Sequence, residues 1–136
     1  MKAKLRKITI DNKVYLYRLQ AKYYSPASTI NYSPAVYNKL TVRIYLANHK
    51  TTPLIIEFKT IDDYYMGQPL NVGIPLPHAK SGRSIRVNIN HPFYIRELIL
   101  LGLKNGWTGN NNLPVQNGLE YLTELDFDVS GLMTGN

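Results

Sequence analysis

The sequence contains no cysteine. Disulfide bonds, zinc sites built from thiolates and a catalytic thiol are therefore excluded. Histidine is scarce too: only His49, His78 and His91 are present, and no two of them have the spacing of a metal-binding pair on a helix. Because the common ligand patterns are missing, the sequence predicts no metal site and no cofactor.

Long apolar runs are also lacking. No stretch approaches the roughly 20 apolar residues that a membrane-spanning helix needs. The N-terminal segment is basic, yet it contains no apolar run of about 7–15 residues like that of a signal peptide. We therefore expect a cytoplasmic protein. Its 136 residues suffice for one domain with its own core.

Catalytic motifs are absent from the sequence. There is no G-x-S-x-G nucleophile elbow, and the acids Asp126 and Asp128 lack the rest of a calcium-binding loop. Asp62 and Asp63 are adjacent, so they point apart in an extended chain, whereas acid–base catalysis needs carboxylates that converge. The sequence favours a non-enzymatic protein, although an active site assembled from distant residues would leave no such motif.

What is present is a strong alternation of apolar and polar residues in the first 90 positions. Period-two alternation is typical of strands with one buried face, as in an antiparallel sheet. The turn-forming run Asp11-Asn12-Lys13 predicts a hairpin between the first two strands. The predicted strands cover residues 5–10, 14–23, 40–47, 54–60 and 85–89, with a polar turn at 48–53 and a loop at 25–38.

Residues 90–107 predict the central helix of the protein. Pro92 suits the first helical position, with Asn90 or His91 as the N-cap. Apolar residues then recur at helical spacing. Gly106 predicts a left-handed cap at the end of the helix. We interpret the tryptophan that follows as the hydrophobic contact of this cap rather than as a residue that stacks on a ligand.

Two further segments complete the expected architecture. Residues 61–84 contain several prolines, which predicts an irregular region with one short edge strand at 70–76. Pro114 is expected to open a second helix, with Val115, Leu119 and Leu122 on its apolar face. Gly102, on the apolar face of the first helix, indicates the close approach of a neighbouring backbone.

Strands followed by helices predict an α+β domain. We expect a mainly antiparallel sheet of four to six strands, with the two C-terminal helices packed on one face. Residues 1–129 are expected to form this single domain, and residues 130–136 a flexible C-terminal tail.

Positive charge is concentrated in the first part of the chain. The net charge is +7; residues 1–50 hold ten Lys or Arg and one acid, whereas residues 101–136 hold one Lys and four acids. Such asymmetry is typical of a basic face for an anionic partner. The alternative is that these residues only solubilise the outer side of a sheet.

Outward positions on the predicted strands provide the candidate partner-binding residues. They combine cations with an aromatic side chain on the helix-free face of the sheet. These residues are Arg18, Arg43, Tyr45, Lys59 and Arg86.

A possible anion site lies in the polar run 78–84. Lys80, Ser81, Gly82 and Arg83 would hold an anion on backbone amides and cationic side chains. The run lacks the spacing of a Walker loop and no helix follows it directly. An ordinary surface loop is therefore the alternative interpretation.

The C-terminal third carries a resemblance. The pattern Asn90-His91-Pro92, then Leu98-Ile99, then Gly106-Trp107, followed by a short helix with Asn117-Gly118, resembles a group of small uncharacterised bacterial proteins with no assigned activity. Some small bacterial proteins of this build are immunity or accessory partners of other proteins. That analogy rests on fold alone, so it implies no site residues.

These observations predict a small binding protein whose basic, tyrosine-containing sheet face docks an acidic protein partner. The alternative is a nucleic-acid-binding module that uses the same face, although neither helix is basic enough to lie in a major groove. A third possibility is a small-molecule site beneath residues 61–84. It would appear as an apolar pocket with a few convergent polar groups.

Overall fold

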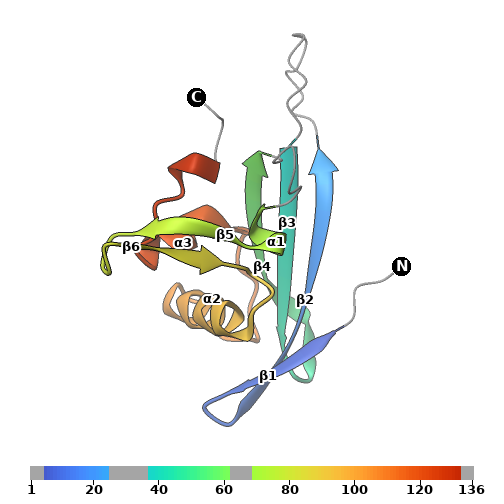
Figure 1. The fold of residues 1–136 in the computed structure, drawn as a ribbon. Helices are drawn as coiled ribbons and strands as arrows, with labels where there is room; N and C mark the ends of the chain where they lie inside the picture. Colours follow the sequence, from blue (N-terminus) through green and yellow to red (C-terminus); the bar gives the residue numbers. More distant parts are fainter. Residues whose placement is uncertain (1–4, 25–36, 62–68, 133–136) are drawn as a thin grey trace.

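The computed structural model describes residues 5–24, 37–61 and 69–132. The order of strands in the main sheet is β1-β2-β3-β4-β7, and β5 and β6 form a separate two-stranded sheet (Figure 1). Among the described residues, no helix has the length and apolar character needed to cross a membrane. The elements are β1 (Arg6–Ile10), β2 (Lys13–Tyr24), β3 (Tyr37–Leu46), β4 (His49–Ile61), α1 (Pro69–Val72), β5 (Ile74–His78), β6 (Arg83–Val87), α2 (Pro92–Lys104), β7 (Gln116–Asn117), α3 (Gly118–Glu124) and the 3-10 turn η1 (Ser130–Leu132).

Tight turns connect β1 to β2 and β3 to β4. Asp11 and Asn12 have φ angles of 50° and 66°, as a two-residue hairpin turn of type I′ requires, so the predicted first hairpin is confirmed. A turn is present between β3 and β4, but it is shorter than the polar turn predicted at 48–53, because the chain already reverses at Asn48 (φ 72°) and β4 begins at His49. Pro53 lies inside β4 where the register with β3 shifts, a place where a strand tolerates proline.

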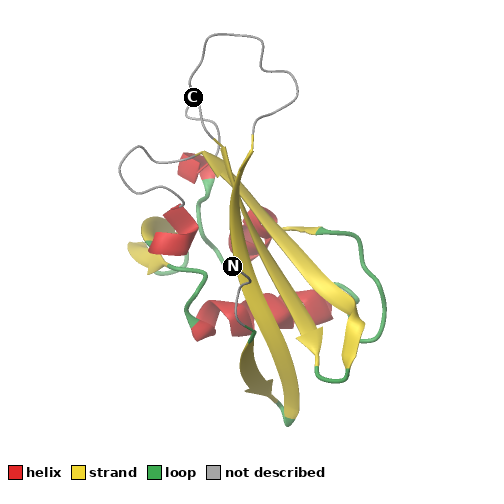
Figure 2. Ribbon diagram, turned by 90° about the vertical axis from the view of Figure 1, so that its right-hand side faces the viewer, coloured by secondary structure: helices red, strands yellow, loops and turns green. Residues whose placement is uncertain are grey.

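One face of the main sheet is the core face. Tyr17, Ile44 and Leu54 are neighbours across β2, β3 and β4 and are at most 3% exposed. A register slip of one residue would turn this apolar set to solvent, so burial specifies the pairing. The opposite face is not covered by any described helix, and the long strands pass in front of α2 in Figure 2.

Helices α2 and α3 both pack on the core face through glycines. A Cβ atom on Gly102 of α2 would collide with the Leu54 side chain, and one on Gly118 of α3 would collide with the Phe58 ring. Leu54 and Phe58 are both core-facing residues of β4, so α2 and α3 cover the same face. The predicted α+β architecture is confirmed. The close neighbour of Gly102 is a side chain, however, and not the backbone that the sequence indicated.

The ends of α2 follow the predicted signals. His91 is the N-cap, and its Nδ1 accepts a hydrogen bond from the Phe93 amide at 3.2 Å. At the other end Gly106 has a φ of 109°, and the Trp107 amide donates to the Gly102 carbonyl at 2.9 Å. This is the Schellman arrangement, in which a glycine cap is followed by a hydrophobic contact.

The second helix starts later than predicted. α3 begins at Gly118, because the Asn117 side chain accepts hydrogen bonds from the amides of Leu119 (3.0 Å) and Glu120 (3.4 Å). Pro114 therefore does not open the helix. The preceding residues are extended instead, and β7 pairs in parallel with β4.

The segment between β4 and α2 also differs in part from the prediction. Of the short strand expected at 70–76, the first part is helical and belongs to α1, and β5 covers Ile74–His78. The expected strand at 85–89 pairs only with β5 and not with the main sheet. Of the loop predicted at 25–38, residues 25–36 lie outside the described residues, and Tyr37 and Asn38 already belong to β3.

The packed chain extends beyond the predicted domain end. Ser130–Leu132 form η1, and Leu132 is 2% exposed within the core. The prediction of a flexible tail from residue 130 is therefore wrong for its first three residues, because one buried leucine anchors them. Residues 133–136 lie outside the described residues.

Candidate functional site

The uncovered face of the sheet is the first candidate site. Its side chains alternate with the core residues along β2, β3 and β4, and the strand register aligns them in rows. We call this surface the open basic face. Its described residues are Leu16, Arg18, Gln20, Lys22, Lys39, Thr41, Arg43, Tyr45, Ile55, Glu57 and Lys59.

Like charges stand directly opposite each other on the open basic face. Arg18 is the cross-strand partner of Arg43, and Lys39 lies between Lys22 on one side and Lys59 on the other. Directly opposed side chains have Cβ atoms about 4.5–5.5 Å apart, and like charges at that spacing destabilise a sheet. The five cations share one acid, Glu57, whose carboxylate lies 3.8 Å from the Lys39 ammonium.

Apolar and aromatic side chains adjoin the arginines. Tyr45 is the cross-strand partner of Leu16, and Ile55 is the partner of Arg43. All of these side chains, and Arg18, are half-buried, so the arginine stems contribute to the packed surface. Aromatic residues and arginine beside apolar groups are typical of the core of a protein–protein interface.

The structure brings together four of the five predicted partner-binding residues. Arg18, Arg43, Tyr45 and Lys59 share the open basic face, but Arg86 does not. Arg86 lies on β6 in the separate hairpin, where its Nη2 donates to the Val72 carbonyl at 3.4 Å. A Cβ on the neighbouring Gly73 would lie 2.8 Å from the Arg86 Nε, so this guanidinium packs against the turn after α1.

Two cations of the face were missed as candidates. Lys22 alternates with the core residues of β2, so the strand pattern alone places it beside Arg18 on the outer side. Lys39 lies before residue 40, where the third strand was expected to begin. Only the observed start of β3 at Tyr37 brings Lys39 into the row.

The repulsion on this face predicts a stability change. Replacing Lys22 with Glu turns a like-charge pair with Lys39 into an opposite-charge pair. We therefore expect the free energy of unfolding to rise by about 0.5–1 kcal/mol. Urea unfolding at low ionic strength measures it; Lys22→Gln should give a smaller gain, and added salt should reduce both gains. If Lys22→Glu is no more stable than Lys22→Gln, the charges do not interact as described.

The amides of the predicted anion site are already used within the β5–β6 turn. The amides of Ser81, Gly82 and Arg83 donate to His78 Nδ1 (3.2 Å), the His78 carbonyl (2.9 Å) and Ser81 Oγ (3.2 Å). An anion would have to displace these bonds. A site built on these amides, with Lys80 beside them, would compete with the turn's own hydrogen bonds, and it stays a prediction.

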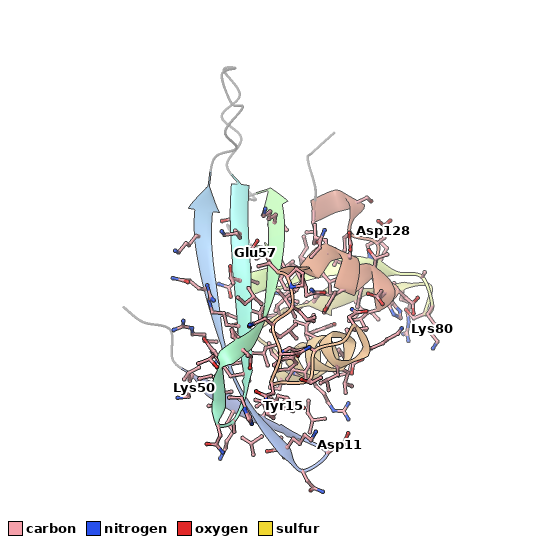
Figure 3. All side chains as sticks on the ribbon, turned by 180° about the vertical axis from the view of Figure 1, so that it is seen from behind. Asp11, Tyr15, Lys50, Glu57, Lys80 and Asp128 are labelled. Carbon is pink, nitrogen blue, oxygen red and sulfur yellow. The ribbon has the colours of Figure 1, made fainter. Side chains whose placement is uncertain are left out.

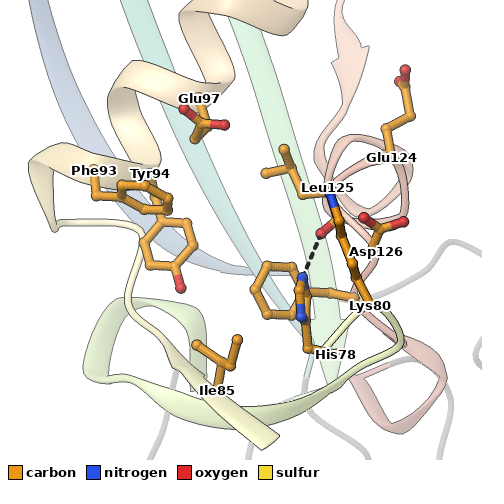
Figure 4. A pocket seen from close by; sticks show the side chains of 10 residues that line it. His78, Lys80, Ile85, Phe93, Tyr94, Glu97, Glu124, Leu125 and Asp126 are labelled. Atoms are coloured by element: carbon orange, nitrogen blue, oxygen red, sulfur yellow. Dashed lines mark hydrogen bonds between the residues drawn. The ribbon is translucent and has the colours of Figure 1, made fainter. Parts of the chain in front are cut away.

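A cavity of about 430 Å³ is the second candidate site. It lies between the β5–β6 hairpin, α2 and the end of α3, and we call it the hairpin cavity (Figure 4). Apolar and aromatic side chains form much of its wall, together with one imidazole, one ammonium and three carboxylates. The lining residues are His78, Lys80, Ile85, Phe93, Tyr94, Glu97, Glu124, Leu125, Asp126 and Phe127.

Hydrogen bonds hold the polar groups of the cavity wall in place. His78 Nδ1 accepts the Ser81 amide proton, so Nε2 carries the ring proton and donates to the Leu125 carbonyl at 3.2 Å (Figure 4). The imidazole packs on Phe127 with ring centroids 4.9 Å apart. Burial raises the pKa of the Tyr94 phenol, which stays neutral and donates to the Arg86 carbonyl at 3.1 Å.

Neither candidate site contains a recognisable metal centre. Within residues 5–24, 37–61 and 69–132, no group of three or more His, Asp or Glu side chains is arranged to hold a metal ion. Comparison with known proteins found no matching family model, no matching curated protein and no matching solved structure.

Proposed function

We propose that this protein is a binding protein whose open basic face docks an acidic protein partner. The observation that carries the proposal is the set of three like-charge cross-strand pairs, Arg18–Arg43, Lys22–Lys39 and Lys39–Lys59. Such pairs oppose folding, whereas an acidic partner would relieve the repulsion. Residues that lower stability without a folding role are candidates for function.

The composition of the face favours a protein over a nucleic acid. Sequence-tolerant binding of single strands uses several aromatic side chains on which successive bases stack. On the open basic face, Tyr45 and the arginines instead adjoin the apolar side chains of Leu16 and Ile55, which suit the core of a protein interface.

The test compares two matched substitutions. Arg43→Glu reverses a charge on the open basic face, and Arg83→Glu makes the same change on the β5–β6 hairpin. Figure 3 shows Lys80 of that hairpin and Glu57 of the sheet on different sides of the molecule. Arg43→Glu also places an acid opposite Arg18, so the fold should be retained.

The probes are a fluorescent peptide rich in Glu and Leu and a fluorescent single-stranded oligonucleotide, followed by anisotropy at two salt concentrations. We expect Arg43→Glu to weaken peptide binding by about tenfold or more, as for the loss of an interface arginine, and Arg83→Glu to have little effect. Equal losses in both variants would reduce the effect to net charge and contradict the proposal. Tighter, steeply salt-dependent binding of the oligonucleotide would replace it with the nucleic-acid alternative.

A further inference from the structure

The hairpin cavity has the size and lining of a ligand site, and its function is separate from that of the open basic face. Small-molecule sites are mostly apolar hollows of about 300–1,000 Å³ with a few polar groups that orient the ligand. The 430 Å³ hairpin cavity falls within this range. Phe127 and Tyr94 are each 7% exposed on its wall, whereas Phe93 is 55% exposed. That exposed ring supplies apolar surface for a ligand to cover.

The charge of the cavity is opposite to that of the protein. Glu97, Glu124 and Asp126 line it against one cation, Lys80, which makes its formal charge −2 with His78 neutral, on a chain of net charge +7. Three of the nine acids in the sequence therefore surround one cavity. A ligand that carries a positive charge is favoured here over a neutral or anionic one.

The three carboxylates of the cavity form weak ion pairs, or none, with other described residues of the protein. Glu97 is 3.8 Å from Arg96, and Glu124 is 3.9 Å from Lys104, whose side chain is 72% exposed. Exposed ion pairs of this kind contribute little. Asp126 forms no ion pair within the described part of the chain.

Asp126 occupies a position where a carboxylate does not help folding. Its φ of 75° is left-handed, and the amide of the next residue, Phe127, donates to the Leu122 carbonyl at 3.0 Å, as in a helix C-cap. Glycine or asparagine is the usual residue there. A negative charge beside the last carbonyls of a helix is also unfavourable. The Asp126 charge thus serves neither the cap nor an ion pair with another described residue.

We propose that the hairpin cavity binds a small arylalkyl amine. The ammonium group would pair with a carboxylate of the cavity lining, which Glu97 supplies from α2 and Asp126 from the end of α3 (Figure 4). The aromatic body would pack against Phe93, Ile85 and Phe127. Electron-rich faces of the aromatic rings add attraction for a cation that is partly removed from water.

The probe is 2-phenylethylamine at neutral pH, compared with 2-phenylethanol and 3-phenylpropionate, which present the same ring with no charge or a negative charge. Titrations of the ¹⁵N-labelled full chain are followed by amide chemical shifts. We expect shifts at Phe93, Tyr94, Glu97 and Phe127 on addition of the amine. We expect the amine to bind about tenfold or more tightly than the carboxylate.

Substitutions test the role of the carboxylates. Asp126→Asn keeps a residue that tolerates the left-handed backbone and removes only the charge, so the fold should persist. We expect Asp126→Asn and Glu97→Gln each to weaken amine binding several-fold, and Glu120→Gln, on α3 but outside the cavity lining, to leave it unchanged. Phe93→Ala should weaken binding of both the amine and the alcohol.

Three results would overturn the proposal. The first is equal affinity for all three compounds, which would indicate an apolar hollow without selectivity for an amine. The second is amine binding that Asp126→Asn and Glu97→Gln reduce no more than Glu120→Gln does. The third is the absence of amide shifts around the cavity with 2-phenylethylamine. None of these results depends on the open basic face. The proposed docking function is therefore tested independently of the amine proposal.

Discussion

Replacing Trp107 with Ala is expected to lower the free energy of unfolding by about 3–5 kcal/mol. The Trp107 side chain is 1% exposed, and its Nε1 donates to the Thr52 carbonyl at 3.1 Å. Its ring also packs against Tyr15 with centroids 6.0 Å apart. The substitution removes the apolar contacts, leaves a cavity and deprives the Thr52 carbonyl of its donor.

The loss would be large relative to the whole stability of a domain, which is typically about 5–15 kcal/mol. Urea unfolding followed by circular dichroism is the suitable measurement, because the variant contains no other tryptophan to report by fluorescence. Trp107→Phe separates the two contributions, since it keeps a ring and removes the N–H donor. Phe93→Ala, at an aromatic that is 55% exposed, is the control and should change stability far less. A Trp107→Ala loss similar to that of the control would contradict the structural role of this residue.

Replacing Leu98 with Ala is expected to lower the free energy of unfolding by about 2–5 kcal/mol. Leu98 is fully buried on the face of α2 that packs on the sheet, and the glycine one turn later, Gly102, holds the helix close to Leu54. A tightly packed helix has little freedom to collapse into the space that the leucine leaves. Alanine is a good helix former, so the cost reflects packing rather than loss of helix propensity.

Leu5→Ala is the matched control for this prediction, because it makes the same substitution at a side chain that is 40% exposed. Leu119→Ala on α3, at a leucine that is 6% exposed, should fall in the same range as Leu98→Ala. The variants are compared by the urea concentration at the midpoint of unfolding, provided that the slope of the unfolding free energy against urea concentration is unchanged. A change below about 0.5 kcal/mol at Leu98, the size typical of surface substitutions, would mean that α2 does not bury this face.

Local sequence signals predicted much of the fold because they act over a few residues. The turn at Asp11-Asn12, the N-terminal proline of α2 and the Gly106-Trp107 cap each depend on backbone geometry within one turn. Alternation along β2 likewise determines which side chains share a face, since successive side chains of a strand point to opposite sides. These signals sufficed for the α+β class, for the burial of Trp107 and for the outward direction of Arg18.

Local signals misled where one capping side chain decided the outcome. The apolar spacing from Pro114 onward fitted a helix, yet the Asn117 side chain accepts the first amide protons of α3 and moves its start to Gly118. Val115 is consequently 52% exposed instead of packed. A helix that starts at Pro114 and one that starts at Gly118 both fit the same apolar spacing. The close approach of Gly118 to Phe58 favours the start at Gly118.

The sequence by itself determined the central parts of β1 to β4, their buried faces, the capped central helix and the excess of positive charge. Only the tertiary structure decided which strands are neighbours, because pairing depends on contacts between residues far apart in the chain. That choice opposes Lys39 to Lys22 and Lys59, and it places Arg86 in the hairpin with β5, away from the open basic face. The hairpin cavity has the same origin: residues 78–85, 93–97 and 124–127 meet there only after β5, α2 and α3 have packed, so no spacing along the chain could reveal it.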